Sequence, residues 1–556
     1  MTPIMRSLLV AVCLFFTATC GNAQTQQYPD YYTNYSSEIV PRPVTCNIDS
    51  GSRAMRIGNG TCVVFSDSSE LKAAQYFADY VDKYFGISVK LAKKSPVTPC
   101  ITFINARNGG KQGGYTLNVD STRGAVVRGN DEQGTFYGMV TLLQMLPTRA
   151  GVLPVLPGAS ITDAPWFDYR GMHLDVVRHF FPVSFVKRYI DWLALHKMNY
   201  FHWHLTDDQG WRIEIKSHPE LSAGAQNRAG EIEGVFPGSY RELPYGAYYT
   251  QEQIREVIRY AADRCVTVIP EIDVPGHCMA VLSAHPEFST TPDIPKTTAR
   301  TWGIYNRQNN VLAPTPEVFR FLDDVFNEVC DLFPGEYVHA GGDECAPKWW
   351  KESKSTQKFI KKHGLIDENG LQRYFMDYVR RIVNAHGKTL IGWNGGIEQC
   401  DSAGTVVENW HHRSATNTKQ ITPGHRTIVA SGRWFYFDYR EDSTHKITMS
   451  DRKRLLTVKN VYDFNIVPDS ATEVEARNII GAEGCMWTEY IPAEWKAEQM
   501  VFPRLAALSE NMWLGPQRNW VDFQRRLVRQ SERYDLWGIR YNPIYFLNQS
   551  PDPRYR

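Results

Sequence analysis

Residues 169–207 read YRGMHLDVVRHFFPVSFVKRYIDWLALHKMNYFHWHLTD and contain the unit that decides the fold. Tyr169–Asp175 and Met198–Asp207 are short, nearly continuous apolar runs of the kind that form strands buried on both faces. The segment between them has apolar residues on one helical face, namely Val186, Tyr189, Ile190 and Leu193. A strand, a helix and a second strand in this order predict a parallel sheet covered by helices.

The same alternation continues along the chain. Further strand candidates are Val266–Asp273, Tyr337–Glu344, Thr389–Asn394, Thr405–Trp410, Thr427–Arg433 and Ile479–Glu489. Helices are predicted between several of them, because Thr250 with Gln253 forms a capping box and Thr315 with Pro316 has the form of a helix start. Eight strands are the number that a closed parallel barrel requires. We therefore predict an α/β protein with a (β/α)8 TIM barrel over residues 166–515.

Two further parts flank the predicted barrel. Residues 37–163 combine two amphipathic helical stretches, about 70–84 and 133–145, with extended candidates at 101–104 and 124–128, which indicates a small α/β domain. Asp163, Ala164 and Pro165 mark its boundary, since proline resists continuation of either regular element. Residues 516–556 are expected to form a C-terminal helical tail packed on the barrel.

Composition limits the function classes. The chain has 556 residues, with 61 Lys plus Arg against 60 Asp plus Glu, so its net charge is +1. This balance gives no electrostatic reason to expect nucleic acid or an anionic membrane as a partner. The 29 Tyr, 26 Phe and 15 Trp supply more flat apolar surface than a core needs, and sugar-binding clefts use such surface.

The N-terminus has the pattern of an export signal. Arg6 precedes an apolar run from Ser7 to Ala18, and small residues precede Gln24, so residues 1–23 are predicted to be a cleaved signal peptide. Cys20 leaves open the alternative of a lipid-anchored first residue. We expect an exported protein, periplasmic, secreted or lipid-anchored at the cell surface, without a membrane span.

The cysteines do not form a metal-binding pattern. Of eleven, nine remain if Cys13 and Cys20 leave with the signal, and no CxxC pair or Cys/His cluster with zinc spacing occurs. Most of the nine are expected to be buried free thiols. A disulfide among Cys46, Cys62 and Cys100 stays open.

Polar and aromatic side chains gather where the predicted strands end. The active sites of barrel enzymes are built at the carboxyl ends of the strands. The first strand begins with Arg170, and the residues at the later strand ends are His202, His204, Asp207, Asp208, Asp273, His277, Asp343, Glu344, Trp393, Trp410, Tyr436, Asp438, Trp487 and Glu489. Clustered carboxylates and Trp side chains predict a site for a polar, ring-shaped ligand.

These residues belong to motifs that resemble those of a known family. HAGGDE at His339–Glu344 is similar to the His-x-Gly-Gly-Asp-Glu signature of the family 20 glycoside hydrolases, the β-N-acetylhexosaminidases. The resemblance continues through RGMHLDVVRHF, NYFHWHLTDDQGWR, PEIDVPGH and CMWTE, which start at Arg170, Asn199, Pro270 and Cys485, and it includes the small domain. The family usually has Ile where Ala340 stands, a change that we expect to be tolerated.

The adjacent carboxylates also have a chemical meaning of their own. Glycosidases that form a covalent sugar ester use carboxyl groups about 5 to 5.5 Å apart on opposite sides of the reacting carbon. Neighbouring strand residues have Cα atoms about 3.8 Å apart and opposite side-chain directions, which suits a different division of roles. Glu344 protonates the glycosidic oxygen, and Asp343 reaches only a substituent beside the reacting carbon. A 2-acetamido group is such a substituent, and its carbonyl oxygen attacks the anomeric carbon.

The resemblance implies the remaining roles. Glu344 is the general acid and later the base, and Asp343 helps it to keep its proton near neutral pH. Asp207, rather than the neighbouring Asp208, and His277 orient Glu344, while Tyr436 donates to the acetamido oxygen. The residues expected to bind the sugar are Arg170, Trp393, Trp410, Asp438, Trp487 and Glu489. The implied activity is exo-hydrolysis of terminal β-linked GlcNAc or GalNAc from glycans or chitooligosaccharides, without cofactor or metal.

Two other functions stay open at this point. His202 and His204 share a strand face and, with an Asp, have the pattern of a metal-dependent barrel hydrolase. A non-catalytic glycan-binding protein would also keep an aromatic cleft. The sequence does not decide between GlcNAc and GalNAc, the linkage, the aglycone, the tolerance of sulfated sugars or the oligomeric state.

Overall fold

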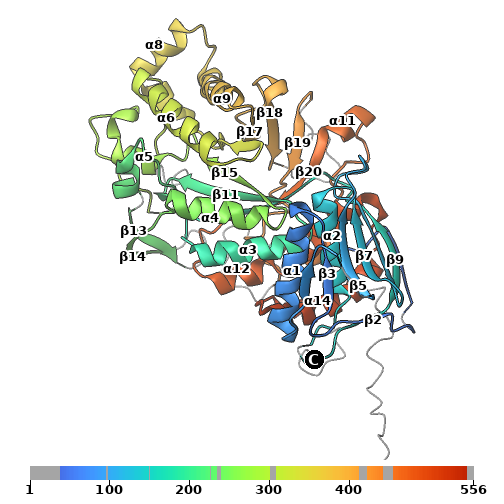
Figure 1. Ribbon diagram of the computed structural model, residues 1–556. Coiled ribbons are helices and arrows are strands. Elements are labelled where there is room, and N and C mark those ends of the chain that lie inside the picture. The colour runs from blue at the N-terminus through green and yellow to red at the C-terminus, as the bar shows by residue number, and fades with distance from the viewer. Residues whose placement is uncertain are drawn as a thin grey trace, which may run out of the picture.

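The computed structural model describes residues 38–49, 51–94, 98–149, 151–225, 227–233, 239–300, 309–411, 423–442 and 455–546. The predicted signal peptide and the end of the predicted C-terminal tail lie outside these residues. Figure 1 shows the small N-terminal domain in blue beside a larger helical and stranded body that runs from green to red.

The larger body is a closed parallel barrel, which confirms the predicted fold. Neighbouring strands pair in parallel around the ring, and the first strand closes it by pairing with both the second and the last. The eight barrel strands are β10 (Tyr169–Asp175), β11 (Tyr200–Asp207), β15 (Thr267–Ile272), β16 (Tyr337–His339), β17 (Thr389–Trp393), β18 (Thr405–Asn409), β19 (Arg426–Val429) and β20 (Ile479–Gly484). Short β12 (Gly210–Trp211) extends β11 as a hairpin.

Helices surround the barrel unevenly. Thr250 and Thr315 cap α4 and α6, and the predicted capping box of Thr250 with Gln253 is present. The helices between and after the strands are α3 (Val183–Leu195), α4 (Gln251–Ala262), α5 (Met279–Ala284), α6 (Pro316–Leu332), α7 (Pro347–Glu352), α8 (Lys354–Lys362), α9 (Glu368–Ala385), α10 (Val458–Asp463), α11 (Glu473–Asn478), α12 (Glu494–Val501) and α13 (Arg504–Leu514). Only a 3₁₀ turn, Ser402–Gly404, joins β17 to β18. A hairpin of β13 (Asn227–Glu233) and β14 (Ser239–Gly246) precedes α4.

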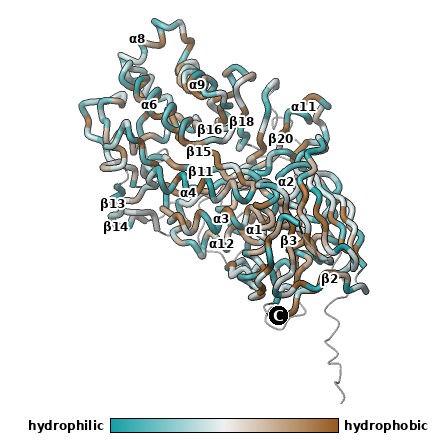
Figure 2. The backbone as a smooth tube through the Cα atoms, viewed as in Figure 1, coloured by the Kyte–Doolittle hydropathy of each residue, from teal (hydrophilic) through white to brown (hydrophobic). Residues whose placement is uncertain are grey.

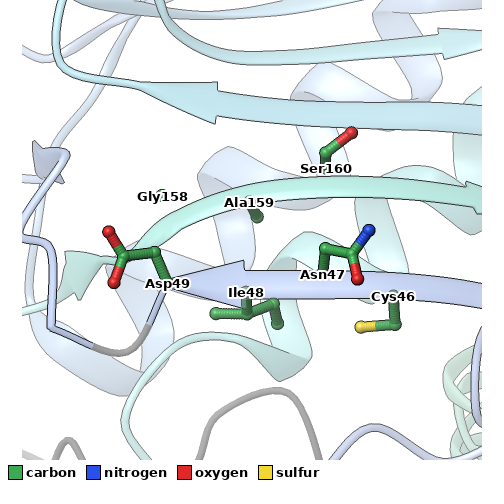
Figure 3. A pocket seen from close by; sticks show the side chains of 7 residues that line it. All are labelled: Cys46, Asn47, Ile48, Asp49, Gly158, Ala159 and Ser160. Carbon is green, nitrogen blue, oxygen red and sulfur yellow. The ribbon is translucent and has the colours of Figure 1, made fainter.

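The small domain is one mixed sheet with two helices. The sheet has the strand order β1-β9-β6-β7-β5-β3-β4. Its strands are β1 (Thr45–Asp49), β3 (Cys62–Val64), β4 (Lys90–Ala92), β5 (Cys100–Asn105), β6 (Tyr115–Asp120), β7 (Gly124–Gly129) and β9 (Gly158–Asp163); β2 (Met55–Arg56) and β8 (Val155–Leu156) pair separately. The helices α1 (Ser68–Phe85) and α2 (Glu132–Gln144) pack on each other and on the central strands. A shallow pocket lies on edge strand β1 and its neighbour β9 (Figure 3).

Buried polar contacts join the small domain to the barrel. Lys197 forms a fully buried ion pair with Asp163 at 3.1 Å, and the Trp513 indole N–H donates to the same carboxylate at 2.9 Å. The C-terminal helix α14 (Trp520–Trp537) adds a third link, because Arg526 donates to the Ile39 carbonyl and to Glu510 on α13. The small domain is therefore fixed against the amino-terminal end of the barrel.

Hydropathy follows this architecture. Figure 2 shows hydrophobic residues along barrel strands such as β15 and hydrophilic residues on outer helices such as α8. Among the described helices, none is long and apolar enough to cross a membrane. All nine described cysteines are free thiols, so Cys46, Cys62 and Cys100 form no disulfide here.

Candidate active site

Most of the predicted site residues lie at the carboxyl ends of the barrel strands. Asp207 ends β11, His277 follows β15, and Trp393 ends β17. The segments after β19 and β20 also meet, since Tyr436 and Cys485 form a parallel bridge that brings Tyr436 close to Trp487, with ring centroids 6.0 Å apart. Residues from the ends of five strands, β11, β15, β17, β19 and β20, therefore contribute to one site.

The acidic pair lies on a loop and not on a strand. Strand β16 ends at His339, whereas the sequence predicted that it continues to Glu344. Gly341, Gly342 and Glu344 have φ angles of 61°, 89° and 41°, which strand geometry does not allow. The double glycine thus turns the chain, and a non-glycine residue in this region indicates backbone strain of the kind found at functional sites.

Asp273, just after β15, holds this loop in place through a hydrogen bond. Its Oδ1 accepts a hydrogen bond from the Gly342 N–H at 3.1 Å. A Cβ atom on Gly341 would lie 1.9 Å from the same oxygen, so only glycine fits there. The close approach of loop and carboxylate fixes the position of Asp343 and Glu344.

Both acidic side chains face the same imidazole. His277 Nε2 lies 3.5 Å from Glu344 Oε2 and 3.8 Å from Asp343 Oδ2. The prediction that neighbouring side chains diverge to opposite faces is therefore wrong, because the turn at Gly341 and Gly342 replaces the strand. On the other side of the ring, His277 Nδ1 lies 3.1 Å from Asp207 Oδ1 and 3.4 Å from Asp208 Oδ2.

Asp207 is better placed than Asp208 to support His277. Besides the shorter distance, its second oxygen contacts Arg178 at 2.6 Å and His204 Nε2 at 3.0 Å. Asp208 instead accepts the Met279 N–H and so anchors the start of α5. The geometry favours the predicted pair of Asp207 and His277.

The protonation of the pair differs from the expectation. Burial raises the pKa of Asp343 to about 6, and Glu344 adds to the rise although His277 opposes it. Burial also acts to raise the pKa of Glu344, but the hydrogen bond and the charge of His277, together with Arg178, leave it lowered. The expected effect of Asp343 in keeping the proton on Glu344 is thus outweighed, and Asp343 is the member of the pair that binds a proton more tightly.

His277 is the charged partner in this arrangement. Burial by itself would lower its pKa, but Asp207, by charge and hydrogen bond, with Asp208 and Glu344, raises it well above the usual value. A positively charged imidazole then stands between the supporting carboxylate Asp207 and the acidic pair.

Aromatic side chains form the floor of the site. Trp393 and Trp487 have ring centroids 5.9 Å apart, and Trp410 and Tyr436 pack on the same cluster. The Trp393 indole N–H donates to Glu271 at 2.7 Å, and that of Trp410 donates to the Asn394 carbonyl at 3.1 Å. These two hydrogen bonds fix the rings of Trp393 and Trp410, so their faces are presented in one orientation.

Three carboxylates at the site have buried oxygens without a hydrogen bond. These oxygens are both of Asp438, Oε2 of Glu489 and Oδ1 of Asp343, and none makes a hydrogen bond within the described protein. Burial and the neighbouring Glu489 raise the pKa of Asp438 well above its usual value, and burial raises that of Glu489 to about 7. Unsatisfied buried acceptors are rare in proteins, and here they suit a ligand that brings hydroxyl donors.

Arg170 is not at this site, which corrects the prediction. It lies near the start of β10, at the opposite end of the barrel, and is 1% exposed. Its guanidinium donates to the carbonyls of Phe167 at 2.7 Å and Lys197 at 2.8 Å and to the Tyr137 hydroxyl at 2.7 Å. Arg170 therefore joins the barrel to the small domain.

Arg178 is the arginine that the sequence reasoning missed. It follows the carboxyl end of β10, bonds Asp175 at 3.1 Å and Asp207 at 2.6 Å, and lies over the Trp487 ring at 5.1 Å from its centroid. The positions of the two arginines in the sequence could have shown this. Arg178 follows the carboxyl end of the predicted strand Tyr169–Asp175, where barrel active sites lie, whereas Arg170 stands near the start of that strand.

The histidines of the barrel interior are arranged as hydrogen-bond partners. His204 Nδ1 lies 2.5 Å from Glu271 Oε2, and His202 Nδ1 lies 2.7 Å from Glu483 Oε1. Two ligands of one Zn²⁺, each bound at about 2 Å in tetrahedral geometry, would stand farther apart. His202 and His204 are thus part of a network of buried imidazoles and carboxylates in the barrel interior.

The carboxylate pair, the aromatic floor and the unpaired acceptors at the strand ends have the chemistry needed to bind a sugar and to cleave a glycosidic bond. Comparison with protein families agrees: residues 167–516 match the catalytic domain of glycosyl hydrolase family 20, and residues 36–164 match its domain 2. The chain belongs to glycosyl hydrolase family 20.

Individual relatives support this assignment. A β-hexosaminidase of Porphyromonas gingivalis is 34% identical over 95% of this chain and 67% of that protein. One of Vibrio furnissii is 36% identical over 72% of this chain and 65% of that protein, so the chain spans about two thirds of the length of these relatives. The crystal structure of an exo-β-N-acetylglucosaminidase from Vibrio harveyi with N-acetylglucosamine has a TM-score of 0.78 and 29% identity, covering 91% of this chain and 78% of that one.

Proposed function

We propose that the protein is an exo-acting β-N-acetylhexosaminidase that removes terminal β-linked GlcNAc or GalNAc from glycans or chitooligosaccharides with retention of configuration. The observation that carries the proposal is the acidic pair on one loop, with both carboxyl groups within 4 Å of His277 Nε2. Two carboxyl groups that share one imidazole contact do not flank the anomeric carbon from opposite faces, as the two carboxylates of an ester-forming glycosidase do. The nucleophile is therefore the acetamido oxygen of the substrate.

In the first step, Glu344 gives its proton to the glycosidic oxygen as the bond from that oxygen to the anomeric carbon breaks. The acetamido carbonyl oxygen forms the new bond to the anomeric carbon, and an oxazolinium ion results. Asp343 accepts the N–H of this ion and balances its positive charge. The Tyr436 hydroxyl donates a hydrogen bond to the acetamido oxygen and so directs this oxygen at the anomeric carbon.

In the second step, water attacks the anomeric carbon. Glu344 takes a proton from the water, the bond to the acetamido oxygen breaks, and the sugar leaves with its original configuration. The rings of Trp393, Trp410 and Trp487 enclose the acetyl methyl and the sugar face. Arg178, Asp438 and Glu489 bind the ring hydroxyls, which supply the donors that the two buried carboxylates lack.

Substrate binding reverses the protonation of the resting pair. Catalysis requires a protonated Glu344 and an ionised Asp343, whereas His277 favours the opposite arrangement in the free enzyme. An acetamido N–H that donates to Asp343 stabilises its charged form, and a sugar that covers Glu344 favours the neutral form of that residue. The proton thus moves to Glu344 when the correct substrate is bound.

We further propose that the protein acts outside the cytoplasm. The support is the pattern of residues 1–23, and Cys20 leaves a lipid anchor as the alternative to cleavage. The N-terminal sequence and mass of the mature protein, recovered from the native host, decide between these forms.

Hydrolysis of 4-nitrophenyl glycosides of GlcNAc, GalNAc and glucose tests the proposed activity. Both N-acetyl sugars should be cleaved and glucose not, because glucose lacks the internal nucleophile. The rate should fall as the acetyl methyl is fluorinated stepwise, since fluorine withdraws electrons from the attacking oxygen. Glu344→Gln should lower turnover by about 10² to 10⁴ on substrates with poor leaving groups.

Two outcomes would refute the mechanism. One is a rate that does not respond to fluorination. The other is a sugar ester trapped on a protein carboxylate during turnover, which mass spectrometry of the quenched enzyme would detect. Activity that disappears with a chelator and returns with a divalent ion would support the metal-dependent alternative instead.

A further inference from the structure

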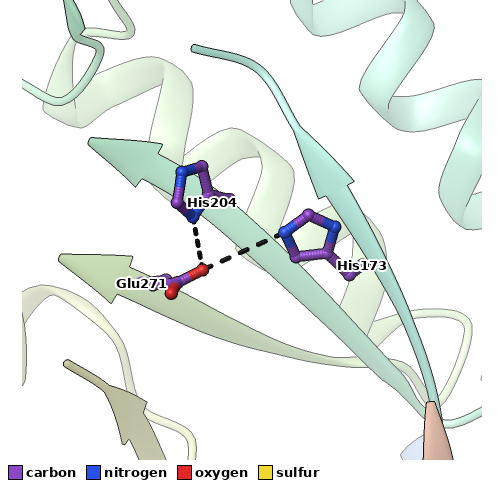
Figure 4. Close-up of side chains that lie close together, drawn as sticks. All are labelled: His173, His204 and Glu271. Atoms are coloured by element: carbon purple, nitrogen blue, oxygen red, sulfur yellow. Dashed lines mark hydrogen bonds and ion pairs between the residues drawn. The ribbon is translucent and has the colours of Figure 1, made fainter. Parts of the chain in front are cut away.

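A line of hydrogen-bonded groups runs from the barrel interior to the acidic pair. Its inner end is Glu271 on β15, whose Oε2 lies 2.5 Å from His204 Nδ1 on the neighbouring strand β11. Figure 4 shows His204 and His173 both directed at this carboxylate. The other ring nitrogen of His204 lies 3.0 Å from Asp207 Oδ2. His204 therefore bridges two carboxylates, and all three side chains are at most 1% exposed.

The line continues to the proton donor, and its last link is an ion-pair contact. Asp207 uses its second oxygen for His277 Nδ1 at 3.1 Å, and His277 Nε2 faces Glu344 at 3.5 Å. Glu271 also has a second contact, because its Oε1 accepts the indole N–H of Trp393 at 2.7 Å. One buried carboxylate is thus linked both to the acid and to the aromatic floor.

We propose that His204 and Glu271 are positioning residues that hold Asp207 and His277 in the orientation needed by Glu344, and that Glu271 aligns the Trp393 ring with the same set of contacts. This inference rests on the proposed hexosaminidase function. Glu271 and His204 touch no substrate atom in this scheme, and they act through the side chains between them and the pocket.

The charges along the line alternate. Burial alone would lower the pKa of His204, but Glu271 and Asp207 raise it to about 9. Burial acts to raise the pKa of Glu271, yet the positive charges of His204 and His202 hold it well below the usual value. At neutral pH the order is therefore an ionised Glu271, a charged His204 and an ionised Asp207. A charged imidazole donates from both nitrogens, so it fixes both carboxylates at once.

Other titratable groups face this line and enter its electrostatics. Around Glu271 and His204 they are His173, His202, His339 and Asp175, and around Asp207 and His277 they are Arg178, Asp208, Asp273, Asp343, Glu344 and Glu489. His339 accepts the Gly341 N–H at its Nδ1, and its pKa is lowered, mainly by burial. His339 is accordingly neutral, and His204 is the charged group of the line nearest to Asp207 on the interior side.

The test is the variant Glu271→Gln, which keeps the shape of the side chain and removes its charge. Without that charge His204 loses one of its two carboxylate partners, so Asp207 and His277 are held less firmly in the orientation that Glu344 needs. Besides burial, the charge of Glu271 also helps to raise the pKa of Asp343, so the alkaline limb of the kcat/KM profile should move down by about 0.5 pH unit. A less well-placed Glu344 donates its proton less readily, so cleavage of chitobiose should fall by about tenfold and that of the 2,4-dinitrophenyl glycoside by less than about threefold.

Glu408→Gln is the matched control. Glu408 on β18 is also fully buried in the barrel interior, and burial with the neighbouring Glu483 raises its pKa well above the usual value. It is therefore already neutral, and glutamine should leave both the leaving-group dependence and the pH profile unchanged. A loss in Glu271→Gln that is equal for both leaving groups, with an unmoved alkaline limb, would show a purely structural role and overturn the proposal.

A second measurement does not depend on a folded variant. Neutron diffraction from deuterated wild-type crystals at pH 7 should locate deuterons on both ring nitrogens of His204, and a single deuteron would overturn the proposal. Hydrolysis of the N-acetyl substrates by the wild type distinguishes failure of the proposed function from failure of the positioning role. If the wild type lacks this activity, the proposed function fails; if it is active but Glu271→Gln behaves like Glu408→Gln, only the positioning role fails.

Discussion

At the scale of single residues, Arg178 and Arg170 form a natural pair for experiment because they lie at opposite ends of β10. Arg178→Lys should lower kcat/KM by about 10² or more with little change in melting temperature, since one ammonium group cannot contact Asp175 and Asp207 as the guanidinium does. Arg170→Lys should keep the kinetic constants within about threefold but lower the free energy of unfolding, because carbonyl groups lose their donors. Steady-state kinetics and urea denaturation of both variants measure kcat/KM and the free energy of unfolding. The reverse pattern would show that Arg170, and not Arg178, acts at the site.

The acidic pair predicts a pH dependence with a definite sign. The free enzyme needs one proton on the pair, and the pKa of Asp343, about 6, sets the loss of that proton. We therefore expect kcat/KM to fall as the pH rises through about 6. In Asp343→Asn the residual activity should decline at lower pH than in the wild type, because the pKa of Glu344 is lowered by His277. A limb that moves upward in this variant would contradict the assignment of the proton.

At the scale of elements, the loop after β16 requires a residue without a side chain at position 341. Gly341→Ala places a Cβ against Asp273 and requires an alanine at a φ of 61°, so the loop must shift. We expect kcat/KM to drop by at least about tenfold because proton transfer depends on the position of Glu344.

Gly387→Ala is the control for this prediction. Gly387 has a similar φ of 71°, but nothing lies within 4 Å of its added Cβ. This variant should lose about 1 kcal/mol of unfolding free energy and keep its activity. Equal kinetic losses in both variants would show that backbone strain, and not the contact with Asp273, is responsible.

The elements also show what sequence alone could predict. All eight barrel strands were predictable, since buried parallel strands are continuous apolar runs, as in Tyr169–Asp175. The end of β16 was not, because a glycine pair can either continue a strand or turn the chain, and contact with Asp273 decides between them. The network around Glu271 was also missed, since its members come from strands far apart in the sequence and only the closed barrel brings them together.

At the scale of the whole molecule, α14 connects the barrel to the small domain. Arg526 donates to both oxygens of Glu510 at 2.7 and 2.6 Å, and both side chains are buried. Arg526→Ala leaves the carboxylate without its main partner, so the free energy of unfolding should fall by about 3 to 5 kcal/mol. The double variant Arg526→Met with Glu510→Gln should recover part of this loss. Urea denaturation followed by circular dichroism tests both, and a single variant as stable as the wild type would contradict the link.

Closure of the barrel sets the moment at which catalysis can begin during synthesis. The Thr488 N–H donates to Asp175 across 313 positions of the chain, and β10 finds its last neighbour only when β20 has been made. Until then β10 has an unpaired edge, and the pocket lacks Trp487 and Glu489. The polypeptide therefore stays inactive until β20 and the segment up to Glu489 have joined the fold.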